Sequence, residues 1–454
     1  MSIELNIDRE IREAYSSDAS GVIMLPDAVA RPDSPEEVVE LLKQATLEQT
    51  GITPAGAQTS TTASSITDGG ILLSLRRLAR IVDFDKAQMM MRVEAGALLG
   101  DVKRLVAAEG MLFPPDPTSE NESTVGGAIA CNASGARSLR YGATRPHIRA
   151  LKVALASGEI IELRRSNLEK NTVGYAFAHD PVDWFIGSEG TLGVILEAEL
   201  GLIPDPGQAL GIAFPFASEE MALGFVVEAR ESQSVSARCL EYFDGLAFEI
   251  ARSADERPGW APDAQAMVYV EEEGLEDADT FEKWMELAER FKADSDVRVF
   301  EGDSQLRQAR RLRHAVPATM NERGAMYRRT GGRKVSTDWA VPYRRLGEAL
   351  TVARQIAAGS GVGQAVIYGH AGNGHPHQNY VARDASELAV IERVIEKTLK
   401  AILAMGGTVA AEHGIGKLKR KWVGLQMSAI QIGAMRAIKH ELDPYNVLAR
   451  GNML

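Results

Sequence analysis

The stretch Gly187-Ser188-Glu189-Gly190-Thr191-Leu192-Gly193 decides the fold, because it joins three glycines to small polar residues and runs directly into a strand-like segment. Glycine lets the backbone approach a ligand closely, and successive backbone N–H groups can bind an anion. Taken alone, the stretch also fits a surface loop that is rich in turns. The sequence before it decides between the two interpretations.

Two more loops of this kind precede it. The first is Pro54-Ala55-Gly56-Ala57-Gln58-Thr59-Ser60-Thr61-Thr62, which lacks bulky side chains and offers hydroxyl donors. The second runs from Pro114 to Ser119, continues through Ser123–Gly127 and Asn132–Gly135, and closes at Tyr141-Gly142. Three such loops within residues 54–193 favour a phosphate-bearing cofactor over three unrelated surface turns. A Rossmann Gly-x-Gly-x-x-Gly after the first strand and a Walker lysine motif are both absent from the sequence.

The composition is that of a globular protein. Of the 454 residues, 45% are hydrophobic and 25% are charged, which argues against low-complexity disorder. A net charge of −12 opposes binding to nucleic acid, and the basic run Arg307–Arg313 fits a solvated helix face better. The two cysteines, Cys131 and Cys239, are too few for a disulfide framework or an iron–sulfur cluster of four thiolates. A reducing compartment fits this cysteine usage.

The sequence contains no membrane or export signal of the usual kind. No apolar stretch approaches the roughly 20 residues that span a bilayer. Residues 1–15 are charged throughout and lack a signal-peptide core. We therefore expect a cytoplasmic protein, whose contact with the inner membrane would be peripheral and through a partner.

The pattern of elements divides the chain. Residues 1–205 alternate strands and helices, including a hairpin over 151–163 and a helix that Ser34 caps, with Glu37 completing a capping box. A boundary is expected after Pro204-Asp205-Pro206, and residues 206–405 follow as a more helical part. Its clearest helix begins at Ser386 as the cap and ends at Gly406-Gly407.

Four of the eight histidines lie between residues 370 and 413. The segment His370–His377 follows an apolar run, and its glycines and Pro376 exclude a helix, so we expect a strand followed by a tight loop. Glu412-His413 follows a second apolar run, Thr408–Ala410, at another expected strand end. Two adjacent strand ends would bring imidazoles and a carboxylate together as a three-ligand metal site, with a further imidazole as general base. Hydrogen-bonded loop histidines are an equal alternative.

Together these motifs resemble the FAD-linked 2-hydroxyacid dehydrogenases: D-lactate dehydrogenase, the large subunit of glycolate oxidase and D-2-hydroxyglutarate dehydrogenase, within the vanillyl-alcohol-oxidase-like flavoproteins. The resemblance covers about residues 20–454. It rests on five segments, which are residues 187–193, 115–135, 369–377, 412–416 and 442–446.

The resemblance implies an α+β fold in three segments. Residues 1–205 would form a FAD-binding domain of the vanillyl-alcohol-oxidase (PCMH) type, and residues 406–454 would return to it as its second part. Residues 206–405 would form an α+β cap domain, which binds the substrate and contains an antiparallel sheet.

The resemblance also implies roles for single residues. A divalent metal, Zn²⁺, Mn²⁺ or Fe²⁺, would be bound by His370, His377 and Glu412. His413 takes the place of the general base, Arg313 that of the arginine for the substrate carboxylate, and Lys334 is a second carboxylate candidate. Noncovalent FAD is expected to contact Pro54, Gly56, Ala57, Gln58, Thr59, Ser60, Thr61, Pro117, Thr118, Ser119, Thr124, Gly126, Gly127, Asn132, Ser134, Gly135, Tyr141, Gly187, Glu189, Gly190, Gly193, Val194, Glu412 and Asn446.

The implied activity is oxidation of a D-2-hydroxy acid, such as lactate, glycolate or 2-hydroxyglutarate, to the 2-oxo acid, with hydride transfer to flavin N5. A separate electron acceptor is expected: an electron-transfer flavoprotein, a cytochrome, an iron–sulfur subunit or a quinone. Two alternatives stay open, which are a non-redox flavoenzyme of the alkyl-glycerone-phosphate-synthase type and a non-catalytic flavin-binding subunit of a larger dehydrogenase. Assembly as a homodimer is also left open.

The sequence departs from the family pattern at two places. The first loop has Gln58, Thr59 and Ser60 where the family has more glycine. The family's Asp-Gly-Asn-Leu-His is here Asn373-Gly374-His375-Pro376-His377, which adds an imidazole. His375 is therefore a fourth metal ligand, a substrate contact or a loop histidine that faces solvent.

Overall fold

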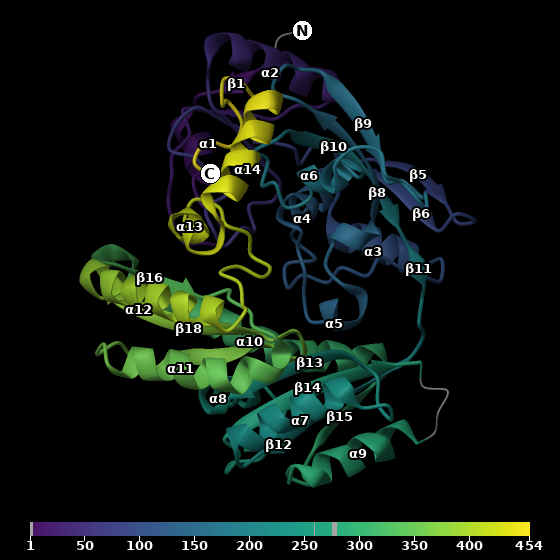
Figure 1. Cartoon of the computed structure of the whole chain (residues 1–454), viewed down its shortest axis with the longest axis vertical. Helices are drawn as coiled ribbons and strands as arrows, with labels where there is room; N and C mark the ends of the chain where they lie inside the picture. The colour runs from purple at the N-terminus through teal and green to yellow at the C-terminus, as the bar shows by residue number, and fades with distance from the viewer. Residues whose placement is uncertain (1–2, 258, 275–278) are drawn as a thin grey trace. The chain divides into compact units, whose positions relative to one another are not determined.

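The computed structural model describes residues 3–257, 259–274 and 279–454. The described residues form two compact units, and their fold is α+β, as the sequence predicts (Figure 1). The first unit contains Met1–Ser134, Gly142–Asp205 and Glu412–Leu454, and the second contains Gly135–Tyr141 and Pro206–Ala411.

The first unit begins with a four-stranded sheet in the order β1-β2-β4-β3, in which β2, β4 and β3 are parallel. Its elements are β1 (Leu5–Asn6), α1 (Arg9–Ala14), β2 (Ala28–Ala30), α2 (Pro35–Glu48), β3 (Ile52–Ala55) and β4 (Ile71–Ser74). The Ser34 hydroxyl caps α2 by accepting from Glu37 N–H at 3.3 Å. The predicted capping box is wrong in its second half, because Glu37 accepts from Asp33 N–H at 2.8 Å and not from Ser34.

A five-stranded antiparallel sheet in the order β5-β6-β10-β8-β9 forms the rest of this unit. Its strands are β5 (Ile81–Asp85), β6 (Met90–Glu94), β8 (Ile148–Ala154), β9 (Ile160–Arg164) and β10 (Val194–Gly201). The predicted hairpin is β8–β9, and its turn contains Gly158 at φ +81°. The remaining α-helices and strands of the unit up to residue 205 are α3 (Leu99–Ala107), β7 (Met111–Leu112), α4 (Val125–Cys131), α6 (Val182–Phe185) and β11 (Ile203–Pro204).

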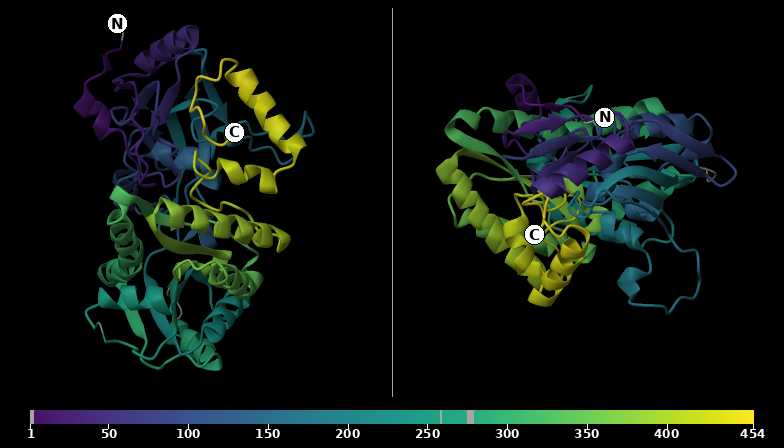
Figure 2. Two further views of the ribbon diagram at one scale, coloured as in Figure 1. Left: turned by 90° about the vertical axis from the view of Figure 1, so that its left-hand side faces the viewer. Right: turned by 90° about the horizontal axis from the view of Figure 1, so that it is seen from above.

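The C-terminal segment packs on the same unit, where it is yellow in Figure 2. It contains α13 (Val423–Gln426) and α14 (Ala429–Leu442). Beyond α14, Ile52 N–H donates to Val447 at 2.7 Å and Ala449 N–H donates to Ile52 at 2.7 Å, which adds this stretch to the edge strand β3. Asp443 fixes the turn, because its carboxylate accepts from the N–H groups of Val447 and Leu448.

The second unit is built on a seven-stranded sheet in the order β15-β12-β14-β13-β17-β18-β16, in which every pair is antiparallel. Its strands are β12 (Ala209–Phe216), β13 (Ala237–Asp244), β14 (Ala266–Glu273), β15 (Arg298–Glu301), β16 (Gly331–Ser336), β17 (Val366–His370) and β18 (His375–Asp384). The antiparallel sheet expected for residues 206–405 is therefore present.

Helices cover both faces of this sheet. The helices are α5 (Ser138–Tyr141), α7 (Glu219–Glu231), α8 (Gly245–Ser253), α9 (Thr280–Arg290), α10 (Gly302–Ala325), α11 (Leu346–Ala358) and α12 (Ala385–Ala404). One face packs on α8 and α10, and the opposite face packs aromatic residues such as Phe214 against Phe225 of α7 and Trp284 of α9.

Two local predictions are wrong in this unit. Asp384, not Ser386, caps α12, because its carboxylate accepts from the N–H groups of Ser386 and Glu387. The expected strand at Thr408–Ala410 is a single bridge between Ala340 and Thr408.

Candidate active site

The first unit contains a pocket between its loops. The first loop, the start of α4 and the Gly187–Gly193 loop all border it. Of the residues expected to contact FAD, those that line the pocket are Pro54, Gly56, Ala57, Gln58, Thr59, Ser60, Thr124, Gly126, Gly127, Glu189, Gly190 and Gly193. Residues that the sequence reasoning missed also line it, namely Ala55, Ser64, Ser65, Leu75, Ala95, Ala130, Cys131 and Ile195.

The pocket suits a nucleotide-linked cofactor. Its lining consists of small, hydroxyl-bearing and apolar residues, so backbone N–H groups and hydroxyls would bind a pyrophosphate there. Gly126 must be glycine, because a Cβ at this position would lie 2.6 Å from Ala95 Cβ and 2.9 Å from the Ala95 carbonyl oxygen. Gln58 has φ +55°, a backbone conformation that glycine favours, which shows how this loop keeps its shape with less glycine.

Several predicted cofactor residues use their side chains for the protein itself. The Gln58 amide donates to the carbonyl oxygens of Tyr15 and Ser17, at 2.9 and 3.2 Å. Asn132 accepts from Arg145 N–H at 2.9 Å. Pro117, Thr118, Ser119, Thr61, Asn132, Ser134, Gly187 and Val194 do not line this pocket, Asn446 lines another hollow of the unit, and Gly135 and Tyr141 belong to the second unit.

Glu189 connects the cofactor loop to the segment that follows His413. Its buried carboxylate accepts from the N–H groups of Ile415 and Gly416, at 2.5 and 2.7 Å. Burial raises the pKa of Glu189 above its ordinary value, and these two hydrogen bonds offset only part of that rise. The Thr62 carbonyl oxygen accepts from Lys417 N–H at 3.0 Å. The backbone that follows His413 is thus fixed to the loops of the first unit.

Glu412 and His413 themselves lie in the first unit. Ser134 Oγ donates to Glu412 at 3.2 Å, and His413 Nε2 lies 3.3 Å from the Glu412 carboxylate. Ser134 therefore donates a hydrogen bond to a predicted metal ligand. The roles of Glu412 as a ligand and His413 as a base stay predictions.

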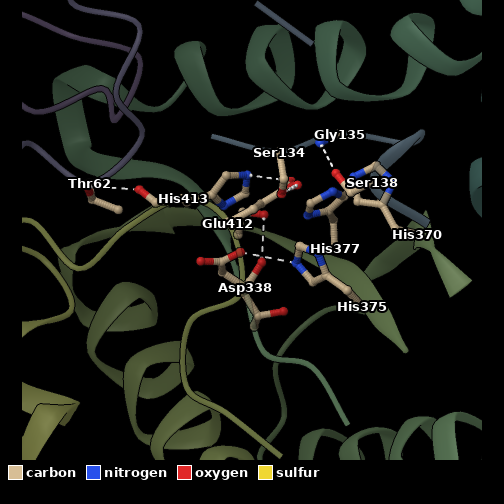
Figure 3. A network of polar contacts seen from close by, with 12 residues as sticks. Thr62, Ser134, Gly135, Ser138, Asp338, His370, His375, His377, Glu412 and His413 are labelled. Atoms are coloured by element: carbon tan, nitrogen blue, oxygen red, sulfur yellow. Dashed lines mark hydrogen bonds and ion pairs between the residues drawn. The ribbon is translucent and has the colours of Figure 1, made fainter. Parts of the chain in front are cut away.

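The second unit brings three histidines together on the hairpin β17–β18 (Figure 3). His370 pairs directly with His375 across the two strands, and His377 follows two residues later on the same face. Each of the three is at most 4% exposed. The loop predicted over 371–377 is shorter than expected, because a single 3-10 turn at Ala371–Asn373 returns the chain into β18.

Gly369 allows this hairpin to form. It has φ +145°, and a Cβ there would lie 2.8 Å from the His375 carbonyl oxygen and 3.0 Å from His377 N. Pro376 sits opposite Gly369 in the strand pair. The glycine and the proline therefore place His375 and His377 at fixed positions beside His370.

Two charged residues, Glu241 and Arg313, contact His370, and Glu241 was not predicted from the sequence. His370 Nδ1 lies 2.6 Å from Glu241 Oε1, and Arg313 Nε donates to Glu241 Oε2 at 2.6 Å. Burial alone would raise the pKa of Glu241, but His370 and Arg313 outweigh it and lower this pKa to about 2. The carboxylate favours the tautomer with its proton on Nδ1, and in that tautomer Nε2 accepts from Arg313 Nη2 at 3.3 Å.

Asp338 is a second carboxylate that the sequence reasoning missed. It is 1% exposed, and its Oδ1 lies 3.1 Å from His375 Nε2. The signal for both missed residues was a single acid in an otherwise apolar run, in Leu240-Glu241-Tyr242 and Asp338-Trp339-Ala340.

Lys334 lies apart from the histidines along the sheet. It pairs with Val381 of β18, four residues after His377, and its ammonium donates to Asn321 at 2.8 Å. Burial lowers the pKa of Lys334 to about 8. Its role as a substrate-carboxylate ligand stays a prediction.

Comparison with known proteins assigns the chain to a family. Residues 26–164 match the FAD binding domain, and residues 209–453 match the C-terminal domain of the FAD linked oxidases. The chain therefore belongs to the FAD-linked oxidase family.

Relatives match it along almost their whole length. The D-2-hydroxyglutarate dehydrogenase of Xanthomonas citri is 31% identical and covers 94% of this chain and 89% of the relative. The glycolate oxidase subunit GlcD of Bacillus subtilis is 28% identical over 97% and 92%, and a D-lactate dehydrogenase of Anaerostipes hadrus is 28% identical over 98% and 93%.

The fold is shared more widely. A solved alkyldihydroxyacetonephosphate synthase superposes with a TM-score of 0.72 at 17% identity, covering 98% of this chain and 81% of that one. Within the part of the chain that the structure describes, no helix is both long and apolar enough to cross a membrane.

Proposed function

We propose that this chain uses noncovalently bound FAD to oxidise a D-2-hydroxy acid to the 2-oxo acid. The observation that carries the proposal is the buried cluster of His370, His375 and His377, with Glu241 and Arg313 behind His370. A divalent ion on His370 and His377 explains why imidazoles are gathered in the interior. The resemblance supplies Glu412 as the third ligand.

The cofactors supply the redox and Lewis-acid chemistry: FAD accepts the hydride, and the divalent ion polarises the substrate hydroxyl. The protein contributes the proton transfer and the orientation. His413 takes the hydroxyl proton, which an imidazole can do near neutral pH. Arg313, whose guanidinium lies beside His370, orients the substrate carboxylate through a charged pair.

A separate acceptor would take the electrons from the reduced cofactor. The relative from Bacillus subtilis is named as a subunit, which supports a protein partner for this chain as well. An electron-transfer flavoprotein, a cytochrome, an iron–sulfur subunit and a quinone remain the candidate acceptors.

Anaerobic mixing of the purified full-length protein with single acids tests the proposal. We expect D-lactate, glycolate or D-2-hydroxyglutarate to bleach the flavin absorbance, and the L-enantiomers to leave it unchanged. Flavin that dithionite bleaches and none of these acids does would overturn the proposal. Exchange of the acyl group of an acyl-dihydroxyacetone phosphate without flavin reduction would favour the synthase-type alternative.

A further inference from the structure

His375 stands where the family pattern has asparagine, and its position is set by the sheet. It faces His370 across β17–β18, so both side chains project from one face, and His377 lies two residues further along that face. All three imidazoles therefore come from adjacent positions of one rigid hairpin in one unit.

The distances between the rings match those around a single ion. The ring centroids are 5.5 Å apart for His370 and His375, 5.3 Å for His370 and His377, and 4.7 Å for His375 and His377. Metal–nitrogen bonds of about 2.0–2.1 Å at a tetrahedral angle place ring centroids about 5 Å apart. The nitrogens that face the centre lie within 4.8 Å of one another, so small side-chain rotations bring them to bonding distance.

The surroundings of His375 repeat those of His370. A buried carboxylate contacts one ring nitrogen of each, with Glu241 at 2.6 Å from His370 and Asp338 at 3.1 Å from His375. Histidines that bind metals usually donate their other ring N–H to such a group, which fixes the ring and raises its basicity. A histidine that faced solvent would need no such partner, and His375 is only 4% exposed.

We propose that His375 is a ligand of the divalent ion, with Asp338 as its positioning residue, so that three imidazoles bind the metal from the second unit. The inference rests on the metal site of the proposed function and specifies its ligands. A set rich in nitrogen favours Zn²⁺, Co²⁺ or Ni²⁺ over Mn²⁺, which prefers oxygen ligands. The extra imidazole therefore determines which metal the protein selects.

Copper(II) electron paramagnetic resonance of the metal-free, FAD-loaded full-length protein counts the nitrogen ligands directly. After stoichiometric Cu²⁺ is added, we expect hyperfine structure from three imidazole nitrogens in the wild type and from two in His375→Leu. His440→Leu, which removes an exposed histidine of the first unit, serves as the control and should keep three. Two imidazole nitrogens in the wild type would overturn the inference, and this measurement needs no variant to fold.

Competition titrations give a second measurement. Asp338→Asn should weaken zinc binding by about 10–100-fold, the usual effect of an outer-shell change. His375→Leu should weaken it at least as much and lower the ratio of Zn²⁺ to Mn²⁺ affinity. Equal ratios in wild type and His375→Leu would remove His375 from the ligand set but leave the proposed metal site intact. Absence of any tight divalent binding in the wild type would instead contradict the metal of the proposed function.

Discussion

The cofactor pocket of the first unit is lined by loops and glycines, whereas the histidine cluster of the second unit stands on two paired strands of a sheet. In the pocket, side chains such as those of Gln58 and Glu189 bind neighbouring backbone, so the backbone itself is left to face the ligand. In the cluster the backbone is occupied by the sheet, and the side chains face the ligand. Substitutions should therefore act through backbone shape in one region and through side-chain chemistry in the other.

Removal of the metal is expected to give the largest loss of activity, and it should affect the histidine cluster while leaving the pocket unchanged. Exhaustive chelation should abolish turnover, because the substrate hydroxyl loses its Lewis acid. The melting temperature and the FAD content should change little, since the sheet and the pocket do not depend on the ion. Metal analysis, flavin absorbance and a thermal melt of the same sample measure this, and adding back Zn²⁺ should restore the rate. Full activity with less than about a tenth of an ion per chain would contradict the prediction.

His413→Ala should slow flavin reduction by about 10²–10⁴-fold, the usual size of a general-base loss. FAD content should stay close to that of the wild type, because the loops hold the cofactor and Glu189 holds the backbone after residue 413. Stopped-flow reduction under anaerobic conditions gives the rate. His440→Ala, an exposed histidine of the same unit, is the control and should reduce normally. A wild-type rate in His413→Ala would show that another group takes the proton.

Much of the fold was predictable, because the local signals and the tertiary structure agree. The hairpin β8–β9, the first turn of α2 and the antiparallel cap sheet all follow from periodicity, turn residues and the family pattern. The errors arose where two candidates compete over one or two residues. Asp384 and Ser386 both suit a helix cap, and it is the Asp384 carboxylate that accepts from the first N–H groups of α12.

The candidate site was predictable to a different degree in the two regions. Glycine positions mark the pocket, but the sequence does not show which way a loop side chain points, so it did not predict the protein contacts of Asn132 and Ser134. Their contacts with the cofactor stay predictions. The histidines were found by their spacing. Their partners Glu241 and Asp338 lie 129 and 37 positions away in the chain, and strand pairing or loop packing that no local motif encodes brings them close.

Replacing one glycine of each region by alanine should weaken a different ligand in each case, FAD at the pocket and the metal at the histidine cluster. Gly126→Ala places a Cβ 2.6 Å from Ala95 Cβ at the pocket, and Gly369→Ala places one 2.8 Å from the His375 carbonyl oxygen at the cluster. Overpacking of this kind costs about 1–3 kcal/mol, or about 5- to 150-fold in an affinity.

We therefore expect Gly126→Ala to lose FAD affinity and keep metal affinity, and Gly369→Ala to do the reverse. Fluorescence titration with FAD and competition titration with a zinc chelator measure the two affinities for both variants. Gly110→Ala, a glycine with open space around it, controls for the strain of a positive φ. Equal losses of both ligands in both variants would show that the two regions do not respond separately.

The smallest expected effect is a pH dependence of stability at Lys417, which donates to Asn452 at 2.8 Å and to the Ala63 carbonyl oxygen at 3.3 Å beside the pocket. Burial lowers the pKa of Lys417 to about 8, although Asp18 and Glu189 raise it. An unfolded lysine titrates near about 10.4, so between about pH 8 and 10 the unfolded chain still holds a proton that the native chain has released. The free energy of unfolding must then rise with pH across that window, and Lys417→Met should remove the rise.

Urea unfolding followed by flavin release, compared between wild type and variant across the window, measures how the free energy of unfolding changes with pH. Lys334→Met, whose lysine also has its pKa lowered to about 8 but lies in the second unit, should leave the slope of this flavin signal unchanged. If Lys417→Met keeps the wild-type slope, the ammonium is solvated in the native protein and does not hold the C-terminal segment against the pocket loops in the way that its hydrogen bonds indicate.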